Sequence, residues 1–456
     1  MFLKKKANYS TTRIIAIGFI VAIILGTILL SLPISTKDRS VTPWIDALFT
    51  ATTSICVTGL TTVNTLEHWS IFGKGVILFL IQFGGLGVVT FSTTILLLIG
   101  KRITLHERLL IQDAYNLNTL RGLVKLTKKI IKGTLLVEGV GALFYMIQFV
   151  PEFGFLEGMG KAIFVSVSAF CNAGMDVIGH ASLMPYRDNG LINIVTMTLI
   201  VTGGIGFPVW WDLLSTFKRT IKKDVKVKNI FRVLSLHTKI ALSATAFLII
   251  FGTVLIMIFE YNNPYTIGNL TNENKIMSSM FQSVTTRTAG FFTIPQQNFT
   301  DASSFLSLIL MFIGGSPSGT AGGIKTVTIA ITIFSAISIL KNKKDVEAFK
   351  RKLSDFYIKK AITVIIINLF VLMCTIVALT IVEKGSFIDI VFESTSALAT
   401  VGLSRDFTGS LSTLGKFIIV VTMYLGRIGP ITMALSFSLK KSKGLRTLPE
   451  EKILVG

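Results

Sequence analysis

Charged side chains are scarce in this chain of 456 residues: only 15% are Asp, Glu, Lys or Arg, whereas 51% are hydrophobic. That balance excludes a soluble globular protein. Histidine is rarer still, with four residues and no pair at the spacing of a metal site, so the sequence offers nothing typical of a membrane enzyme. Three cysteines (Cys56, Cys171 and Cys374) cannot form a disulfide framework, and we expect free thiols.

Long apolar runs are what the chain has instead. Several reach the roughly 20 residues that cross a bilayer. The first, residues 14–32, follows a basic start but is too long for the core of a signal peptide, and no small-residue cleavage site follows it. We therefore expect an all-α, multi-pass protein of the cell membrane.

Basic residues cluster between the apolar runs. Of the net charge of +21, most lies in residues 101–132, 218–239 and 341–360, which carry eight Lys or Arg each, and in the two ends of the chain. By the positive-inside rule, both termini and the three basic segments are cytoplasmic. This placement argues against nucleic acid as a partner and favours anionic lipids or an acidic partner protein.

The same order of segments recurs in four apolar regions, about 11–100, 133–217, 237–340 and 361–439. In each, a long apolar helix precedes a segment rich in Ser, Thr, Ala and Gly, and a second apolar helix follows. In the first region these are a helix over 11–32, a pore segment over about 44–62 and a helix over about 70–99. We predict four helix–pore loop–helix units, residues 1–118, 119–228, 229–352 and 353–456, with eight spanning helices in a pseudo-fourfold arrangement around one pore.

One glycine marks each pore segment at a nearly constant interval. Gly59, Gly174, Gly290 and Gly402 are separated by 115, 116 and 112 residues. Backbone that is not helical at membrane depth must be buried in protein or line water, and rings of carbonyl oxygens can replace the water around a cation. Glycine accepts the backbone angles that aim such carbonyls. We predict a K⁺ filter made of Val57, Thr58, Gly59, Asn172, Ala173, Gly174, Thr288, Ala289, Gly290, Thr400, Val401 and Gly402. The alternative is that these glycines serve close helix packing.

The pore segments carry a family resemblance. The segments Thr53–Leu60, Ala169–Gly174, Ser283–Phe291 and Ala397–Leu403, with the ending Pro449–Gly456, resemble the Trk/Ktr/HKT superfamily of cation transporters, and within it the Ktr-type membrane subunits of potassium uptake. The resemblance implies a pseudosymmetric pore in one subunit, a homodimer, and a cytosolic regulatory ring that alone binds nucleotide. Related plant transporters that prefer Na⁺ have serine at the first filter glycine. Gly59 therefore favours K⁺, and the family also implies stimulation by Na⁺.

The second helix of the third unit is interrupted. Residues 314–325 hold five glycines and a proline, each of which destabilises a helix interior, by about 1 kcal/mol for glycine and about 3 for proline. We predict a mobile loop below the filter that obstructs the pore and moves to open it; a static kink is the alternative. The predicted gating loop comprises Gly314, Gly315, Ser316, Pro317, Ser318, Gly319, Thr320, Ala321, Gly322, Gly323 and Lys325.

Isolated charges fall at membrane depth. Arg427 should face the protein interior and donate to carbonyls of the gating loop, or alternatively pair with Glu138. Arg287 precedes Gly290 by three residues, and we expect it to point away from the pore, towards a carboxylate such as Glu393. Two further carboxylates, Asp176 and Asp406, lie just beyond filter glycines and are expected either to concentrate cations at the outer mouth or to be ordinary loop residues.

The order of the repeats bears on the kind of transport. Carriers with alternating access are also built from repeats and broken helices, usually as two inverted halves. Here all four units start on the same side, which suits a central pore. A carrier for Na⁺, or for Na⁺ and K⁺, of the same superfamily stays the alternative.

Overall fold

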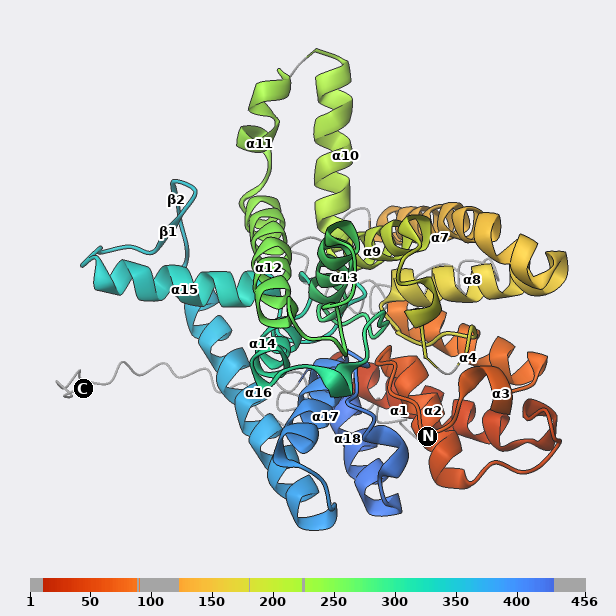
Figure 1. Cartoon of the computed structure of the whole chain (residues 1–456). Helices are drawn as coiled ribbons and strands as arrows, with labels where there is room; N and C mark the ends of the chain where they lie inside the picture. Colours follow the sequence, from red (N-terminus) through yellow and green to blue (C-terminus); the bar gives the residue numbers. More distant parts are fainter. Residues whose placement is uncertain (1–10, 88–89, 91–122, 180, 224–225, 430–456) are drawn as a thin grey trace, which may run out of the picture.

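The computed structural model describes residues 11–87, 90, 123–179, 181–223 and 226–429. This part of the chain is almost entirely helical (Figure 1). The boundary expected between the first and second units, 118–119, lies outside the described residues.

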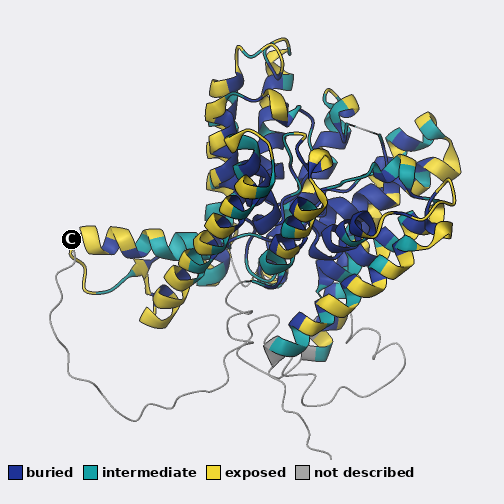
Figure 2. Ribbon diagram, turned by 90° about the horizontal axis from the view of Figure 1, so that it is seen from below, coloured by how far each residue is buried: buried dark blue, intermediate teal, exposed yellow. Residues whose placement is uncertain are grey.

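Four long helices carry apolar surface to the outside of the molecule. They are long and apolar enough to cross a membrane. Their exposed faces are rich in large apolar side chains, and Figure 2 shows that buried residues gather in the centre, between these helices. An exterior of this kind suits contact with lipid. The four are α1 (Thr11–Ser31), α7 (Leu123–Phe153), α12 (Leu236–Glu260) and α16 (Asp355–Val382).

A shorter helix follows each long helix and packs against it. These four helices end close to the predicted filter segments, and most of their residues are buried in protein. We refer to them as pore helices. They are α2 (Trp44–Cys56), α8 (Phe155–Cys171), α13 (Asn272–Thr285) and α17 (Phe387–Ala399).

The second apolar helix of each region begins at the same kind of cap. A side-chain oxygen of Ser70, Asn189, Thr300 or Ser412 accepts a hydrogen bond from the backbone N–H three residues further on. Such a bond satisfies one of the free donors at a helix start. The helices that follow are α4 (Ile71–Leu86), α9 (Gly190–Gly204), α14 (Asp301–Phe312) and α18 (Thr413–Ile428).

None of these second helices is a long unbroken rod in the described residues. Helix α9 is bent by 100° from α10 (Phe207–Ile221), with Gly206 at φ 94° between them and Pro208 in the first turn of α10. Helix α14 is separated from α15 (Thr326–Leu340) by a non-helical segment. The described residues thus contain four candidate spans, or five if the bent pair counts as one, so the predicted total of eight stays a prediction.

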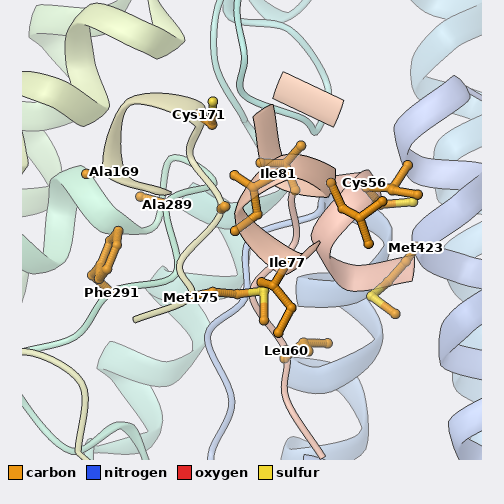
Figure 3. Close-up of a cluster of buried hydrophobic side chains, with 14 of the residues drawn as sticks. Cys56, Leu60, Ile77, Ile81, Ala169, Cys171, Met175, Ala289, Phe291 and Met423 are labelled. Carbon is orange, nitrogen blue, oxygen red and sulfur yellow. The ribbon is translucent and has the colours of Figure 1, made fainter. Parts of the chain in front are cut away.

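The second helix of one unit packs against the pore helix of the next. Figure 1 shows the last helices beside the first ones, so the chain returns to its start. The packing pairs are α4 with α8, α9 with α13, α14 with α17, and α18 with α2. Their shared interior is apolar, and Figure 3 shows Cys56, Ile81, Cys171 and Met423 from four different helices in one cluster.

Small elements complete the described chain. A two-stranded antiparallel hairpin, β1 (Glu347–Ala348) and β2 (Arg351–Lys352), follows α15, and the short helix α11 (Ile230–Val233) precedes α12. The short helix α3 (Thr65–His68) lies after the first filter segment. Cys56 and Cys171 are buried free thiols, as expected, whereas Cys374 is exposed.

Candidate functional site

Each predicted filter segment starts with a residue in the left-handed conformation. The φ angles are 55° at Val57, 60° at Asn172, 66° at Thr288 and 52° at Thr400. Three of these residues are β-branched, for which the conformation is a clear outlier that costs roughly 1–3 kcal/mol. The same strained angle at the same position of four units indicates that the course of the backbone matters here.

Hydrogen bonds to the pore helix hold each turn in place. The residue after the left-handed one donates its N–H back to a carbonyl near the end of the same pore helix: Thr58 to Thr53 and Ala173 to Ser168 at 2.8 Å, Ala289 to Thr285 at 2.9 Å, and Val401 to Ser396 at 2.8 Å. In two units the glycine N–H also donates to a side-chain hydroxyl, from Gly59 to Thr53 at 2.9 Å and from Gly402 to Ser396 at 3.1 Å. These N–H groups are therefore bonded on the pore-helix side of the strand.

The four glycines lie next to one another in a closed ring. All have positive φ, and a Cβ atom on any of them would meet the backbone of the neighbouring unit. A Cβ added to Gly59 would lie 2.6 Å from the Ala173 oxygen, and one added to Gly174 would lie 2.7 Å from the Ala289 oxygen. A Cβ added to Gly290 would lie 2.7 Å from the Val401 oxygen. A Cβ added to Gly402 would collide with the Thr58 oxygen of the first unit. The segments thus follow in chain order, and the fourth returns to the first.

A cavity of about 510 Å³ opens on one side of this ring. All four glycines line it, together with loops that follow each filter segment. Asp176 and Asp406 are the charged residues among its lining side chains. Both acids that the sequence placed near the outer mouth therefore border the same cavity, whose potential they make negative.

The segment between α14 and α15 runs along the opposite face of the filter turns. Its backbone is bonded to the bend between α9 and α10: Ser316 donates to the Gly204 oxygen at 2.8 Å, and the Phe207 N–H donates to the Ser318 oxygen at 3.1 Å. The ends of the loop approach each other, since Gly314 donates to the Ile324 oxygen at 2.9 Å. The non-helical break lies where the sequence predicted it.

The loop contacts the left-handed residues of three units. The Thr320 hydroxyl donates to Oδ1 of Asn172 at 2.8 Å, and the N–H of Gly322 donates to Oγ1 of Thr288 at 3.1 Å. A Cβ on Gly322 would collide with Oγ1 of Thr400, so only glycine fits beneath the fourth unit. The first unit has Val57 at this position, which offers no polar side chain.

Two cationic side chains bind three consecutive carbonyls of the loop. Arg427 donates from Nη1 to the Thr320 oxygen at 2.7 Å and from Nη2 to the Gly84 oxygen of α4. Lys325 donates to the oxygens of Ala321 at 2.6 Å and Gly322 at 3.3 Å. Glu138 makes a different contact, with the Cys171 thiol at 3.7 Å. The structure therefore matches the first of the two expectations for Arg427.

Arg287 does not pair with Glu393, so that part of the expectation for Arg287 is wrong. Glu393 accepts hydrogen bonds from Ser404 at 2.7 Å and Thr408 at 2.5 Å, which fasten the loop after the fourth filter segment to α17. Arg287 instead donates to Thr245 of α12 at 3.2 Å. Both side chains are buried, but they point to different neighbours, because the depth of a residue does not fix the direction of its side chain.

Residues that join the units were missed by the sequence reasoning. Lys416 of α18 pairs with Asp46 of α2 at 2.8 Å, although 370 residues separate them. Arg405 binds Asp389 at 2.8 Å and also donates to the carbonyl oxygens of Gln296 at 3.1 Å and Gln297 at 3.2 Å, which joins the third and fourth units. Such contacts cannot be predicted from a local sequence motif, because each depends on two segments that are distant in the chain.

Comparisons with known proteins cover nearly all of the chain. The family model described as TrkH, cation transport protein, matches residues 3–445. The chain is 39% identical over 453 residues to "Ktr system potassium uptake protein B" of Bacillus subtilis, covering 99% of this chain and 98% of that protein. It is 38% identical over 457 residues to "Potassium/sodium uptake protein NtpJ" of Enterococcus hirae, again covering 99% and 98%.

A solved structure shares the fold. The crystal structure of the potassium transporter TrkH from Vibrio parahaemolyticus matches with a TM-score of 0.73 and covers 96% of this chain and 87% of its own. Sequence identity in that match is 17%, so it speaks for the architecture alone. The helical membrane-protein fold expected from the sequence is thereby confirmed.

Proposed function

This chain belongs to the TrkH family of cation transport proteins, and from that premise we propose that it is the pore-forming membrane subunit of a potassium uptake system. The single observation that carries the proposal is the closed ring of four glycines with their strained neighbours. A ring built from four separate parts of one chain is suited to surround an ion. The potassium uptake protein of Bacillus subtilis is similar over its whole length, which supports the same cargo.

In the proposed mechanism, backbone oxygens replace the water around K⁺. The filter is formed by residues 57–59, 172–174, 288–290 and 400–402. Because the N–H groups of these turns bond back to the pore helices, the other side of each strand is left to its carbonyl oxygens. Carbonyl dipoles stabilise a dehydrated cation without a fixed charge that would hold it too tightly. The strained φ angles are the cost of this alignment.

We assign the loop of residues 314–323, with Lys325, to the gate. Its hydrogen bonds to Asn172 and Thr288 put polar loop atoms directly against the base of the filter. Arg427 and Lys325 hold its carbonyls and add positive charge on the same path. In the closed state both the loop and these charges oppose a leaving cation; movement of the loop opens the route.

The cavity on the other face of the ring serves as the outer vestibule. Asp176 and Asp406 give it a negative potential that raises the local concentration of K⁺. The basic segments 101–132, 218–239 and 341–360 then lie on the cytoplasmic side, with both termini, by the positive-inside rule. Transport is directed from the vestibule through the filter to the cytoplasm of the cell.

The proposed assembly is a homodimer with a cytosolic nucleotide-binding ring as regulator. The name of the Bacillus relative speaks of a Ktr system, which supports a partnership with other components. The basic cytoplasmic face suits an acidic docking surface. Nucleotide binding is assigned to the partner, and Na⁺ is proposed as a stimulating ion.

A carrier of Na⁺, or of Na⁺ with K⁺, is the second candidate. The observation in its favour is the 38% identity to a protein named for potassium and sodium uptake. Proteoliposomes whose membrane potential is clamped at zero separate the two: a carrier shows counter-flow of labelled ion against its gradient, whereas a gated pore does not.

The proposed function is tested by uptake into a bacterium that lacks its own K⁺ transport. The chain, expressed with its regulator, should restore growth at low K⁺. Gly59→Ser and Gly290→Ser should lower the preference for K⁺ over Na⁺, because the added side chain meets backbone of the adjacent unit. Failure of the parent to rescue, or two serine variants that behave like the parent, would remove the filter assignment.

A further inference from the structure

Arg287 carries a buried charge that the proposed mechanism does not use. It lies just after the end of α13, two residues from the Ala289 filter position, and its exposed fraction is 5%. Its Nη2 donates to the Thr245 hydroxyl of α12 at 3.2 Å, whereas its Nε has no hydrogen-bond partner. Within the described ranges, no carboxylate forms an ion pair with it. A guanidinium rarely tolerates an unbonded N–H in a protein interior.

A small cavity adjoins this side chain. It has a volume of about 10 Å³, which is close to the space that one water molecule needs. Arg287 and Val284 of the third unit line it, together with the end of α9 at Gly204 and with Gly315 at the start of the gating loop. The cavity therefore joins three parts of the molecule: filter turn, helix bend and loop.

The backbone around the cavity offers acceptors. The Gly204 oxygen accepts a hydrogen bond from Ser316, and the Gly315 oxygen accepts one from Thr326 at 3.0 Å. A carbonyl oxygen has two lone pairs, so each can accept a second bond. A molecule in the cavity would need to accept from Nε and donate to a carbonyl. Water does both, whereas a metal cation cannot accept a hydrogen bond and is repelled by the guanidinium.

We propose that this cavity is an internal hydration site, whose water accepts a hydrogen bond from Nε of Arg287 and donates to the backbone of Gly204 or Gly315. Arg287 is then a positioning residue, which ties the third filter turn to the hinge of the gating loop. The gating part of this inference rests on the proposed function; the hydration site itself does not.

The test displaces the water without touching Arg287. Val284→Ile adds one carbon atom to the cavity wall, about the volume that the water occupies, and Val195→Ile makes the same change on α9 away from the cavity. The full chain is reconstituted in nanodiscs for a high-resolution map and in proteoliposomes for Rb⁺ uptake. Loss of one hydrogen bond that holds the closed loop should raise the maximal uptake rate about fivefold with KM unchanged.

Each outcome decides a separate claim. The parent and Val195→Ile should show one water beside Nε, and Val284→Ile should show none and take up Rb⁺ faster. A parent map that resolves other buried waters but none here overturns the hydration site. A dry Val284→Ile cavity with unchanged uptake overturns the link to the loop. A parent that carries no Rb⁺ or K⁺ at all overturns the proposed function instead, and the map still decides the site.

Discussion

The backbone oxygen of Thr320 accepts a hydrogen bond from Nη1 of Arg427 at 2.7 Å, although the two residues are 107 positions apart in the chain. This contact joins α18, the last helix that the structure describes, to the middle of the loop beneath the proposed filter. The same guanidinium also reaches the Gly84 oxygen of the first unit. Charge-assisted bonds of this kind are among the stronger ones in a protein.

Arg427→Gln should favour the open loop. The variant loses the charge on both bonds, and a hydrogen bond to a charged group contributes about 1.5 kcal/mol or more. We expect K⁺ uptake in proteoliposomes without the regulator to rise about tenfold. Arg427→Lys, which keeps the charge but not the two-armed geometry, should lie between the variant and the parent. Unchanged flux of Arg427→Gln at normal expression would contradict the role in gating.

Gly402→Ala should abolish K⁺ uptake while the protein stays folded. The new Cβ collides with the Thr58 oxygen, and Gly402 has a φ of 92°, so both space and backbone angle oppose the change. Gly139→Ala is the matched control, since nothing lies within 4 Å of that site in α7. Uptake of labelled K⁺ should fall by more than about tenfold in the first variant only. Similar behaviour of the two variants would count against a filter at Gly402.

Asp406→Asn should weaken the attraction of K⁺ to the vestibule. One of the two carboxylates that line the cavity is lost, while the filter is untouched. We expect KM for K⁺ to rise roughly threefold at low ionic strength, with little change in the maximal rate. The difference should shrink as salt is added, because mobile ions screen the vestibule. A KM that is equal for variant and parent at every ionic strength would show Asp406 to be an ordinary loop residue.

External acid should weaken uptake through Asp176. Burial raises the pKa of this carboxyl, while hydrogen bonds from the backbone N–H groups of Ile178 and Gly179 partly oppose the shift. A raised pKa means that the charge of Asp176 is lost at a higher pH than the charge of an ordinary aspartate. As the outside is acidified, KM for K⁺ should therefore begin to increase at a higher pH than the titration of an ordinary aspartate would produce. In Asp176→Asn the increase of KM that is caused by protonation of Asp176 should disappear. A pH profile of KM identical to that of the parent would contradict this role of Asp176.

The pair Asp46 and Lys416 should stabilise the junction of the last and first units. Both side chains are largely buried, with 12% and 15% exposed, and their charged atoms lie 2.8 Å apart. Removing either partner, by Asp46→Asn or Lys416→Gln, should lower Tm in detergent by about 2 °C. The double variant should lose little more than the worse single one, since the two act as a pair. Lys384→Gln, the control at an exposed position, should leave Tm unchanged. If the two single variants lower Tm by amounts that add up in the double variant, the two residues do not act as a pair.

The four glycine turns of the proposed filter could be located from sequence because their backbone angles favour glycine. The structure shows positive φ angles, which few other residues adopt, at Gly59, Gly174, Gly290 and Gly402. The four glycines therefore recur in the sequence as a recognisable repeat. The break after α14 could be predicted in the same way, from the glycines of residues 314–323. The left-handed backbone angles of Val57 and Thr400 could not be predicted from the sequence, because β-branched residues normally avoid these angles. The surrounding structure holds both residues in this conformation.

The bend between α9 and α10 had a signal that sequence reasoning overlooked. Gly206 and Pro208 stand two residues apart, a pairing that ends one helix and starts the next. The direction of Arg287 had none, because its partner Thr245 lies on the preceding helix α12, 42 positions away in the chain and beyond the reach of a local motif. Helix caps and helix breaks can be predicted from neighbouring residues in the sequence. Contacts between units can be predicted only once the arrangement of the helices is known.

The three polar left-handed residues and the single valine have a consequence for how the loop would leave. The loop contacts the side chains of Asn172, Thr288 and Thr400, whereas Arg427 links the loop to Gly84 of the first unit. If the loop is the gate, as proposed, rotation of this one side chain would release the loop from the first unit while its hydrogen bonds to Asn172 and Thr288 stay in place.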